Sequence, residues 1–182
     1  MATYLLSTVS EPAASSTTLP QTTATSPPGT PRAQQGHSDA VWATKWARRA
    51  GGGELVVTGS ADHSLKLWNP DAPAAPTHTL HAPKSLGIVG LDVDKAEAGA
   101  SFLVSNTVDS VITRWSIDGA HEARKAFGPA ASWDLSLNPR AETMATAGGE
   151  GKVMVLSSAV DTFGDVLANL DATGTFGTAV EY

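Results

Sequence analysis

Four side chains in the first half of the chain combine an imidazole, a hydroxyl, a carboxylate and an indole. They are His37, Thr58, Asp62 and Trp68. A neutral imidazole and a hydroxyl each donate and accept hydrogen bonds, a carboxylate only accepts, and an indole N–H only donates. These groups can form a structural hydrogen-bond chain, or the histidine and aspartate can serve a hydroxyl nucleophile as in Ser/Thr hydrolases. No G-x-S-x-G nucleophile motif accompanies them, which favours the structural interpretation.

One pattern recurs along the chain: a hydroxyl residue, an aspartate four residues later, and a tryptophan six residues after the aspartate. The members are Thr58, Asp62 and Trp68 in the first copy, and Ser105, Asp109 and Trp115 in the second. A third copy keeps the hydroxyl as Thr146 but has Glu150 and Leu156 at the other positions. Successive copies are 47 and 41 residues apart. This period is close to the roughly 40–45 residues of one four-stranded propeller blade.

Short β-prone runs must position these side chains. The runs of the first copy cover residues 41–46, 54–58 and 64–68, and the leading run recurs over 88–93 and 132–137. Leu55 and Val57 are two residues apart, as are Leu65 and Leu67, so each pair falls on one face of a strand. Helical periodicity does not persist beyond about two turns, so the sequence predicts an all-β protein.

The composition narrows the classes of function. The chain has 182 residues, 12 Lys and Arg, 18 Asp and Glu, a net charge of −6 and no cysteine. Such an acidic chain lacks the cationic surplus that displaces counterions from nucleic acid. No apolar run reaches the roughly 20 residues of a membrane span, and the start MATYLLSTVSEP is a poor signal peptide. We therefore expect a protein of the cytoplasm or the nucleus, with no direct binding to nucleic acid or membrane.

Two weaker signals suggest small-ligand sites. His78 and His81 are spaced as H-x-x-H, but without a carboxylate or cysteine partner they are weak evidence for a metal site, and we expect them in a Pro-rich connection after the first blade. The Gly51–Gly53 run lacks the Lys and Ser/Thr that follow a phosphate-binding loop, so we expect a flexible hairpin turn. The sequence thus predicts no metal, no cofactor and no catalytic residue.

The first 35 residues differ from the rest. Residues 10–35 contain ten Ser or Thr and five Pro. This segment buries too little apolar area to offset its ordering entropy, so we expect it to be disordered. Residues 1–9 include the β-prone run Thr3–Val9 and predict a short strand.

The ordered set of motifs after residue 36 resembles the WD-repeat family, and more closely the N-terminal blades of the WD-repeat subunit of superkiller (Ski) complexes. The motifs are GHSDAVWATKW, LVVTGSADHSLKLW, SLGIVGLDV, VDSVITRWSIDG, GPAASWDLSLNP and MATAGGEGKVMVL. The resemblance implies a β-propeller in which His37, Thr58, Asp62 and Trp68 form a buried hydrogen-bond chain. The second and third copies have Lys84 and Gly128 where the first has its histidine, so only the first blade should hold the complete set.

The resemblance implies a non-enzymatic scaffold. In superkiller complexes the propeller joins a tetratricopeptide scaffold and an RNA helicase and supports 3′-to-5′ mRNA decay by the exosome. Related WD-repeat adaptors act in meiotic recombination and in transcription elongation or chromatin complexes, which leaves a second class of partner open. The family's partner surface implies exposure of Trp42, Val89, Trp133, Ala61 and Val108; the alternative is that the two tryptophans pack inside the blades.

The resemblance also implies an incomplete ring. We expect blades near residues 36–80, 84–124 and 128–170, a fourth blade starting at 172–182, and residues 1–9 as the outer strand of a closing blade. The family's propeller has seven blades, and a closed ring is what removes exposed strand edges. The sequence is therefore expected to be a truncated product, a partial gene model or a fragment, which does not function as a folded unit if it cannot close.

Overall fold

The computed structural model describes residues 36–82, 85–128, 132–140 and 142–171. The chain divides into two units, Met1–Arg32 and Ala33–Tyr182, and all described residues belong to the second unit. The strand predicted within 1–9, the disordered segment predicted over 10–35 and the fourth-blade start predicted at 172–182 lie outside the described residues.

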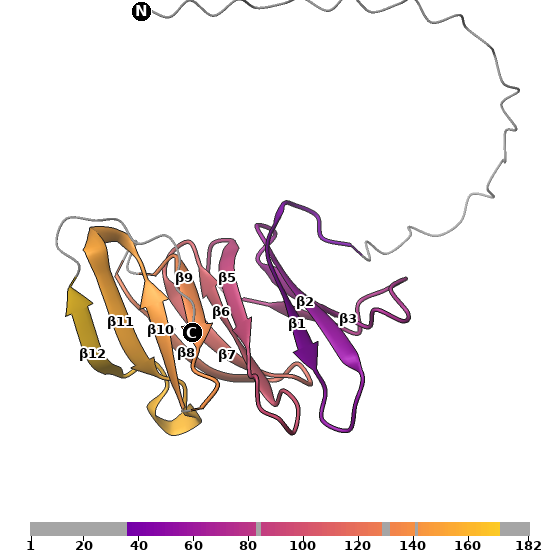
Figure 1. Cartoon of the computed structure of the whole chain (residues 1–182). Coiled ribbons are helices and arrows are strands. Elements are labelled where there is room, and N and C mark those ends of the chain that lie inside the picture. Colours follow the sequence, from indigo (N-terminus) through magenta and orange to yellow (C-terminus); the bar gives the residue numbers. More distant parts are fainter. Residues whose placement is uncertain (1–35, 83–84, 129–131, 141, 172–182) are drawn as a thin grey trace, which may run out of the picture. The chain divides into compact units, whose positions relative to one another are not determined.

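Twelve strands in the described ranges form three four-stranded antiparallel sheets, here named blades 1 to 3 (Figure 1). Blade 1 contains β1 (Val41–Arg48), β2 (Glu54–Ser60), β3 (Ser64–Trp68) and β4 (His78–His81). Blade 2 contains β5 (Ile88–Val93), β6 (Phe102–Thr107), β7 (Val111–Ser116) and β8 (His121–Ala126). Blade 3 contains β9 (Asp134–Leu137), β10 (Thr143–Ala147), β11 (Lys152–Ser157) and β12 (Val166–Asp171), with short 3-10 turns at Gly149–Gly151 and Val160–Thr162.

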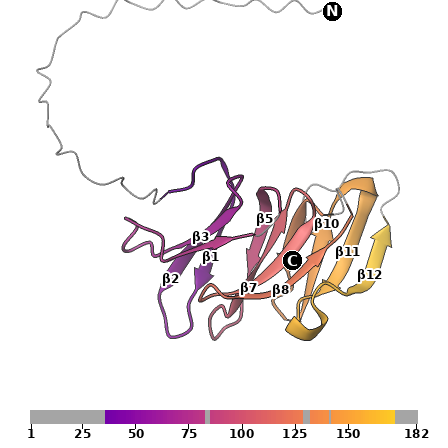
Figure 2. The same cartoon turned by 180° about the vertical axis from the view of Figure 1, so that it is seen from behind.

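Neighbouring strands in each blade are consecutive in sequence. The described elements are strands and two short 3-10 turns, so the all-β prediction is confirmed. Seen from behind, the three sheets stand side by side in chain order (Figure 2). Within the described ranges, no helix has the length and apolar character needed to cross a membrane.

The two faces of each blade have separate roles. We call the face that carries Trp68, Trp115 or Leu156 the front face, and the opposite one the back face. The back face of blade 1 packs on the front face of blade 2; this core includes Leu55, Val57, Leu65, Leu67, Leu91, Val93, Leu103 and Trp115. The back face of blade 2 packs on the front face of blade 3, with a core that includes Val104, Ile112, Leu135, Leu137, Met144, Met154 and Leu156. Alternation along each strand therefore supplies both interfaces.

The expected position of His78 and His81 is wrong. They are not in a connection but open and close β4, the outer strand of blade 1. His78 pairs with Leu67, a back-face residue, and His81 pairs with Ser64. A spacing of three in a strand places side chains on opposite faces, so the two imidazoles do not converge on one metal ion. Among the described residues, no group of three His, Cys, Asp or Glu is placed to hold a metal.

A buried carboxylate links the innermost strands of all three blades. Asp92 of β5 is 1% exposed and accepts a hydrogen bond from the Leu137 backbone N–H of β9 at 2.8 Å. The ammonium groups of Lys45, in β1, and Lys95 lie 3.9 and 3.6 Å from its oxygens. Because burying an unpaired charge is costly, these contacts favour the stacking of the three inner strands.

The hairpin after β1 is tied to the loop that precedes β6. Gly51, Gly52 and Gly53 lie in the turn between β1 and β2, where the sequence predicts a hairpin turn, and all three have positive φ. Ala100 forms an isolated parallel bridge with Arg49, and Gly99 beside it has a φ of +104°. A Cβ added at Gly99 would lie 2.3 Å from the Ala50 nitrogen, so only glycine fits this approach of two backbones.

We expect Gly99→Ala to destabilise the fold more than Gly52→Ala. Both positions have positive φ, which costs an alanine about 1–2 kcal/mol. Only at Gly99 would the new methyl group also collide with backbone, because the space around Gly52 is open. Urea unfolding of both variants measures the difference in free energy. Equal losses would contradict the close packing of these two loops.

Candidate functional site

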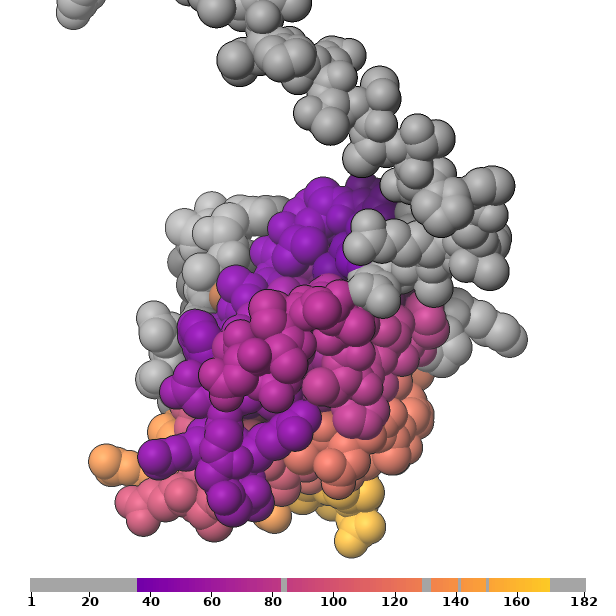
Figure 3. Space-filling model, turned by 90° about the vertical axis from the view of Figure 1, so that its right-hand side faces the viewer, coloured from indigo at the N-terminus to yellow at the C-terminus, as the bar shows by residue number. Residues whose placement is uncertain are grey.

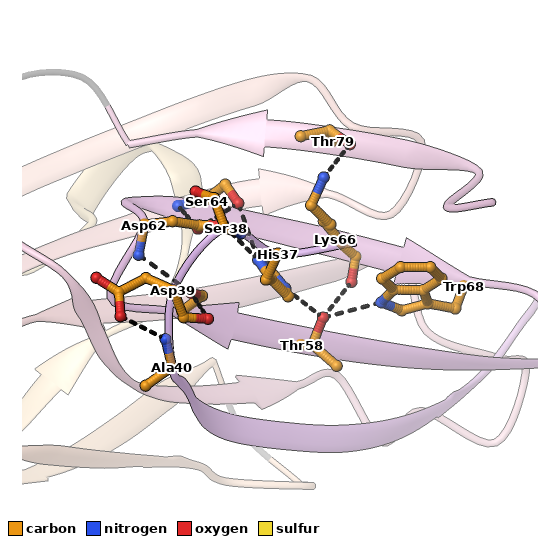
Figure 4. A network of polar contacts seen from close by, with 11 residues as sticks. His37, Ser38, Asp39, Ala40, Thr58, Asp62, Ser64, Lys66, Trp68 and Thr79 are labelled. Atoms are coloured by element: carbon orange, nitrogen blue, oxygen red, sulfur yellow. Dashed lines mark hydrogen bonds and ion pairs between the residues drawn. The ribbon is translucent and has the colours of Figure 1, made fainter. Parts of the chain in front are cut away.

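The four residues of the predicted hydrogen-bond chain come together on the front face of blade 1 (Figure 4). His37 precedes β1, and its Nδ1 lies 3.0 Å from Asp62 Oδ2 while its Nε2 lies 2.8 Å from Thr58 Oγ1. Trp68 Nε1 donates to the same Thr58 oxygen at 2.9 Å. The chain therefore links the segment before β1 to β2, β3 and the turn between them.

The distances favour one direction of donation. The Thr58 hydroxyl has two acceptors in reach, His37 Nε2 at 2.8 Å and the Lys66 carbonyl at 3.4 Å, and the contact to His37 is the shorter one. The Trp68 indole N–H only donates, so Thr58 accepts from it and gives its own proton to His37 Nε2. His37 is then protonated at Nδ1, where it donates to the carboxylate of Asp62. This tautomer follows from the hydrogen-bond network. With every polar group used, the chain fixes the orientation of the segment before β1 against the sheet.

Ser64 is a fifth member that the repeat pattern does not single out. Its hydroxyl donates to Asp62 Oδ1 at 2.6 Å and lies 3.1 Å from His37 Nδ1. Its backbone N–H donates to Asp62 Oδ1 at 3.0 Å, which closes a turn in which His63 has a φ of +65°. An aspartate followed two residues later by a serine is the sequence signal of such a turn, and the signal is present here.

The environment of Asp62 stabilises its ionised form. Burial by itself raises the pKa of the carboxyl, but the hydrogen bonds from Ser64, from the Ser38 backbone and from His37 outweigh it. The pKa of Asp62 therefore lies well below the ordinary value of 3.8. An ionised Asp62 is the acceptor that the chain of donors requires.

The same geometry contains the groups of a hydrolase triad, and their hydrogen bonds argue for the structural role. A nucleophilic hydroxyl needs a free lone pair directed at substrate. The Thr58 oxygen instead lies among three protein groups: Trp68 Nε1 at 2.9 Å, His37 Nε2 at 2.8 Å and the Lys66 carbonyl at 3.4 Å. The side chains of His37 and Asp62 are also only 5% and 8% exposed. We therefore assign these residues to the stability of blade 1.

Blade 2 keeps part of the arrangement. Trp115 Nε1 donates to Ser105 Oγ at 3.0 Å. Asp109 is not joined to this pair; it accepts from Thr107 Oγ1 at 2.7 Å and from the Leu86 backbone N–H at 3.0 Å. Burial alone raises the pKa of Asp109, and these hydrogen bonds with the nearby Arg124 lower it overall. Lys84, which takes the place of the histidine, lies outside the described residues.

Blade 3 departs further from the pattern. Leu156 fills the tryptophan position and is completely buried. The buried hydroxyl of Thr146 has no hydrogen-bond partner among the described residues. Gly128 stands at the histidine position, where it is exposed and has no side chain to donate or accept a hydrogen bond. Of the described blades, blade 1 alone therefore has the complete chain.

Gly87 is the meeting point of three residues predicted to form a partner surface. A Cβ added to Gly87 would lie 3.0 Å from Trp42 Cζ3 and 2.8 Å from Ala61 Cα. The Gly87 carbonyl accepts from the Val108 backbone N–H at 2.9 Å. Trp42 leaves 53% of its surface exposed, so its indole both packs at the junction of blades 1 and 2 and faces solvent. We call Trp42, Ala61, Gly87 and Val108 the rim.

The other two predicted surface residues lie at the next junction and are less exposed. Val89 and Trp133 are half-buried. Gly90 follows Val89, and a Cβ added there would lie 3.6 Å from the Trp133 carbonyl oxygen. The sequence pattern did not single out Leu86, which is 53% exposed just before Gly87. The exposed apolar surface of these loops is therefore concentrated between blades 1 and 2.

Known proteins resemble the chain in sequence and in fold. No protein-family model matches it. It is 32% identical over 123 residues to WD repeat-containing protein VIP3 of Arabidopsis thaliana, a match that covers 64% of this chain and 35% of that protein. A chain in the crystal structure of a mitotic checkpoint complex matches with a TM-score of 0.64 at 15% identity, over 81% of this chain and 44% of that chain. The chain thus spans less than half the length of either protein.

These findings support the WD-repeat resemblance and identify the fold. VIP3 supports the resemblance at the level of sequence. The checkpoint-complex chain, at 15% identity, supports the propeller architecture alone. The three described sheets are therefore arranged as consecutive blades of a β-propeller.

We expect His37→Ala to lower the free energy of unfolding by about 1–3 kcal/mol, because Thr58 and Asp62 each lose one hydrogen-bond partner in a largely buried network. His81→Ala is the matched control, since His81 is exposed on β4 of the same blade. Chemical denaturation measures both. A hydrolytic activity lost in His37→Ala with unchanged stability would overturn the structural assignment.

The lowered pKa of Asp62 predicts a pH-dependent contribution to stability. The contribution is fully present above the pKa of Asp62 in the unfolded chain, about 3.8. It is lost as the pH falls toward the lower pKa of Asp62 in the folded chain, because protonation removes the hydrogen-bond acceptor. Urea midpoints of the wild type and Asp62→Asn, compared between pH 6 and roughly 3, test this. Their difference should shrink below pH 4; parallel curves would contradict it.

Proposed function

We propose that the chain is a non-enzymatic scaffold that binds a protein partner through the rim. The observation that carries this proposal is the half-exposed indole of Trp42 over Gly87, at a junction of two blades. Tryptophan is enriched among the residues that dominate binding energy, because it buries a large, rigid, apolar surface. One side of the ring is packed closely against Ala61 and Gly87, which holds the indole in place while the rest of it faces solvent.

The rigid support of the rim favours the same role. The rim spans four segments: the start of β1, the turn between β2 and β3, the segment before β5 and the turn between β6 and β7. The hydrogen-bond chain of His37 and Asp62 holds the first two, and Asp109 joins the other two by accepting the Leu86 backbone N–H. A surface preorganised in this way loses little conformational entropy when a partner binds.

The finer proposal is a subunit of a superkiller-type complex that supports mRNA decay by the exosome. It rests on the resemblance of the motifs between residues 36 and 156. Its partners would be the tetratricopeptide scaffold and the RNA helicase of that complex, in the cytoplasm. The alternative is an adaptor in meiotic recombination or in transcription and chromatin complexes, for which nuclear localisation would be expected.

We expect Trp42→Ala to weaken binding to the purified tetratricopeptide scaffold of a superkiller complex at least ten-fold, which corresponds to about 1.4 kcal/mol. Trp46→Ala is the matched control, because Trp46 is exposed at the opposite end of β1. Calorimetric titration and thermal unfolding of both variants separate binding from folding. If the wild-type chain binds neither the scaffold nor the helicase, the superkiller proposal fails.

A further inference from the structure

The junction of blades 1 and 2 contains a recess of about 520 Å³ at the end of β1 that lies away from the rim. The wall from blade 1 consists of Arg49, Ala50 and His78, and the wall from blade 2 includes Ile117 and Asp118. Figure 3 faces blade 1, with the hairpin after β1 at its lower end. Both walls belong to blades that already pack on each other, so the recess does not depend on a further blade.

The junction of blades 2 and 3 has a corresponding place, because the two blades repeat the same local backbone. Ile117 in blade 2 and Ser158 in blade 3 each stand two residues after the tryptophan position of their blade. The backbone N–H of Ile117 donates to the Ser101 carbonyl and that of Ser158 to the Glu142 carbonyl, both at 3.0 Å. Ser158 is therefore the structural counterpart of Ile117.

An arginine fills this place at the junction of blades 2 and 3. Arg114 Nη1 donates to the Ser158 carbonyl at 2.8 Å, and its Nε donates to the Glu122 carboxylate at 2.7 Å. The residue of blade 1 that matches Arg114 is Leu67, since each stands one residue before the tryptophan of its blade. Leu67 cannot donate a hydrogen bond from its side chain, and none of the described groups donates to the Ile117 carbonyl.

The turn after β7 offers two acceptors to a cation. Asp118 is exposed and forms no ion pair among the described residues, and the Ile117 carbonyl belongs to the neighbouring residue. Arg49 on the opposite wall is half-buried and does not come within 4 Å of the Asp118 carboxylate. A carboxylate and a carbonyl are the same two acceptors that Arg114 uses at the next junction. The planar fork of a guanidinium can donate to both.

We propose that this recess binds the guanidinium of an arginine in an extended segment of a protein partner. The guanidinium donates to the Ile117 carbonyl and to the Asp118 carboxylate in charge-assisted hydrogen bonds, and its apolar stem packs along the recess. The net charge of −6 attracts a cationic segment to the chain, whereas Arg49 repels the incoming cation and limits the affinity. This site is separate from the rim, because the two lie at opposite ends of β1.

Two acetylated and amidated pentapeptides provide the probe. They are identical except at the central residue, which is arginine in one and citrulline, its uncharged isostere, in the other. Titration into the full chain, followed by amide chemical shifts, should show saturable binding of the arginine peptide, with the largest changes at Ile117 and Asp118. The citrulline peptide should bind at least five-fold more weakly, because it has no charge to pair with the carboxylate.

Four variants complete the test. Asp118→Asn should weaken binding of the arginine peptide at least five-fold, whereas the matched control Asp161→Asn, at an exposed position of blade 3, should not. Arg49→Met should tighten binding, because it removes the like charge from the opposite wall. Trp42→Ala should leave binding unchanged, which separates this site from the rim. Equal affinity for the two peptides, no binding of either, or unchanged affinity in Asp118→Asn would overturn the proposal.

Discussion

A four-stranded blade is apolar on both faces, and each face must be covered. This constraint governs the rest of the structure, because a single sheet of this size has no core of its own. The back face of blade 1 covers the front face of blade 2, and the back face of blade 2 covers the front face of blade 3. Where no described sheet covers a blade, as on the front face of blade 1, the same positions become an exposed surface.

Polar contacts then fix how the blades are oriented. In blade 1 the chain from Trp68 through Thr58 and His37 to Asp62 ties the entering segment to the sheet. Blade 2 has only part of that chain, and polar contacts join it to blade 3. Arg114 packs over the Phe102 ring, pairs with Glu122 at 2.7 Å and donates to the Ser158 carbonyl at 2.8 Å.

The buried amide of Asn106 adds a second link from blade 2, since it donates to the Ser132 carbonyl at 3.0 Å before β9. Asp92 adds a third at the inner strands. The hydrogen-bond chain of blade 1 is thus one of several ways in which this molecule satisfies buried polar groups at blade junctions. Exposed side chains such as Trp42 stand on a scaffold held by these contacts, which is the property that partner binding needs.

The sequence by itself determined the strands that carry the repeat, the repeat itself and the chain of four side chains in blade 1. These depend on spacing within one hairpin, and antiparallel pairing converts a fixed spacing into a fixed contact. The outer strands β4, β8 and β12 were missed. In β4, for example, His78–His81 is short and follows three prolines with no alternating apolar pattern. Only the tertiary structure decided that Trp46 is open while Val93 and Leu137 are buried, and that Asp92 joins three blades. Those properties depend on which residues of a neighbouring sheet lie opposite, and spacing along one strand carries no information about that.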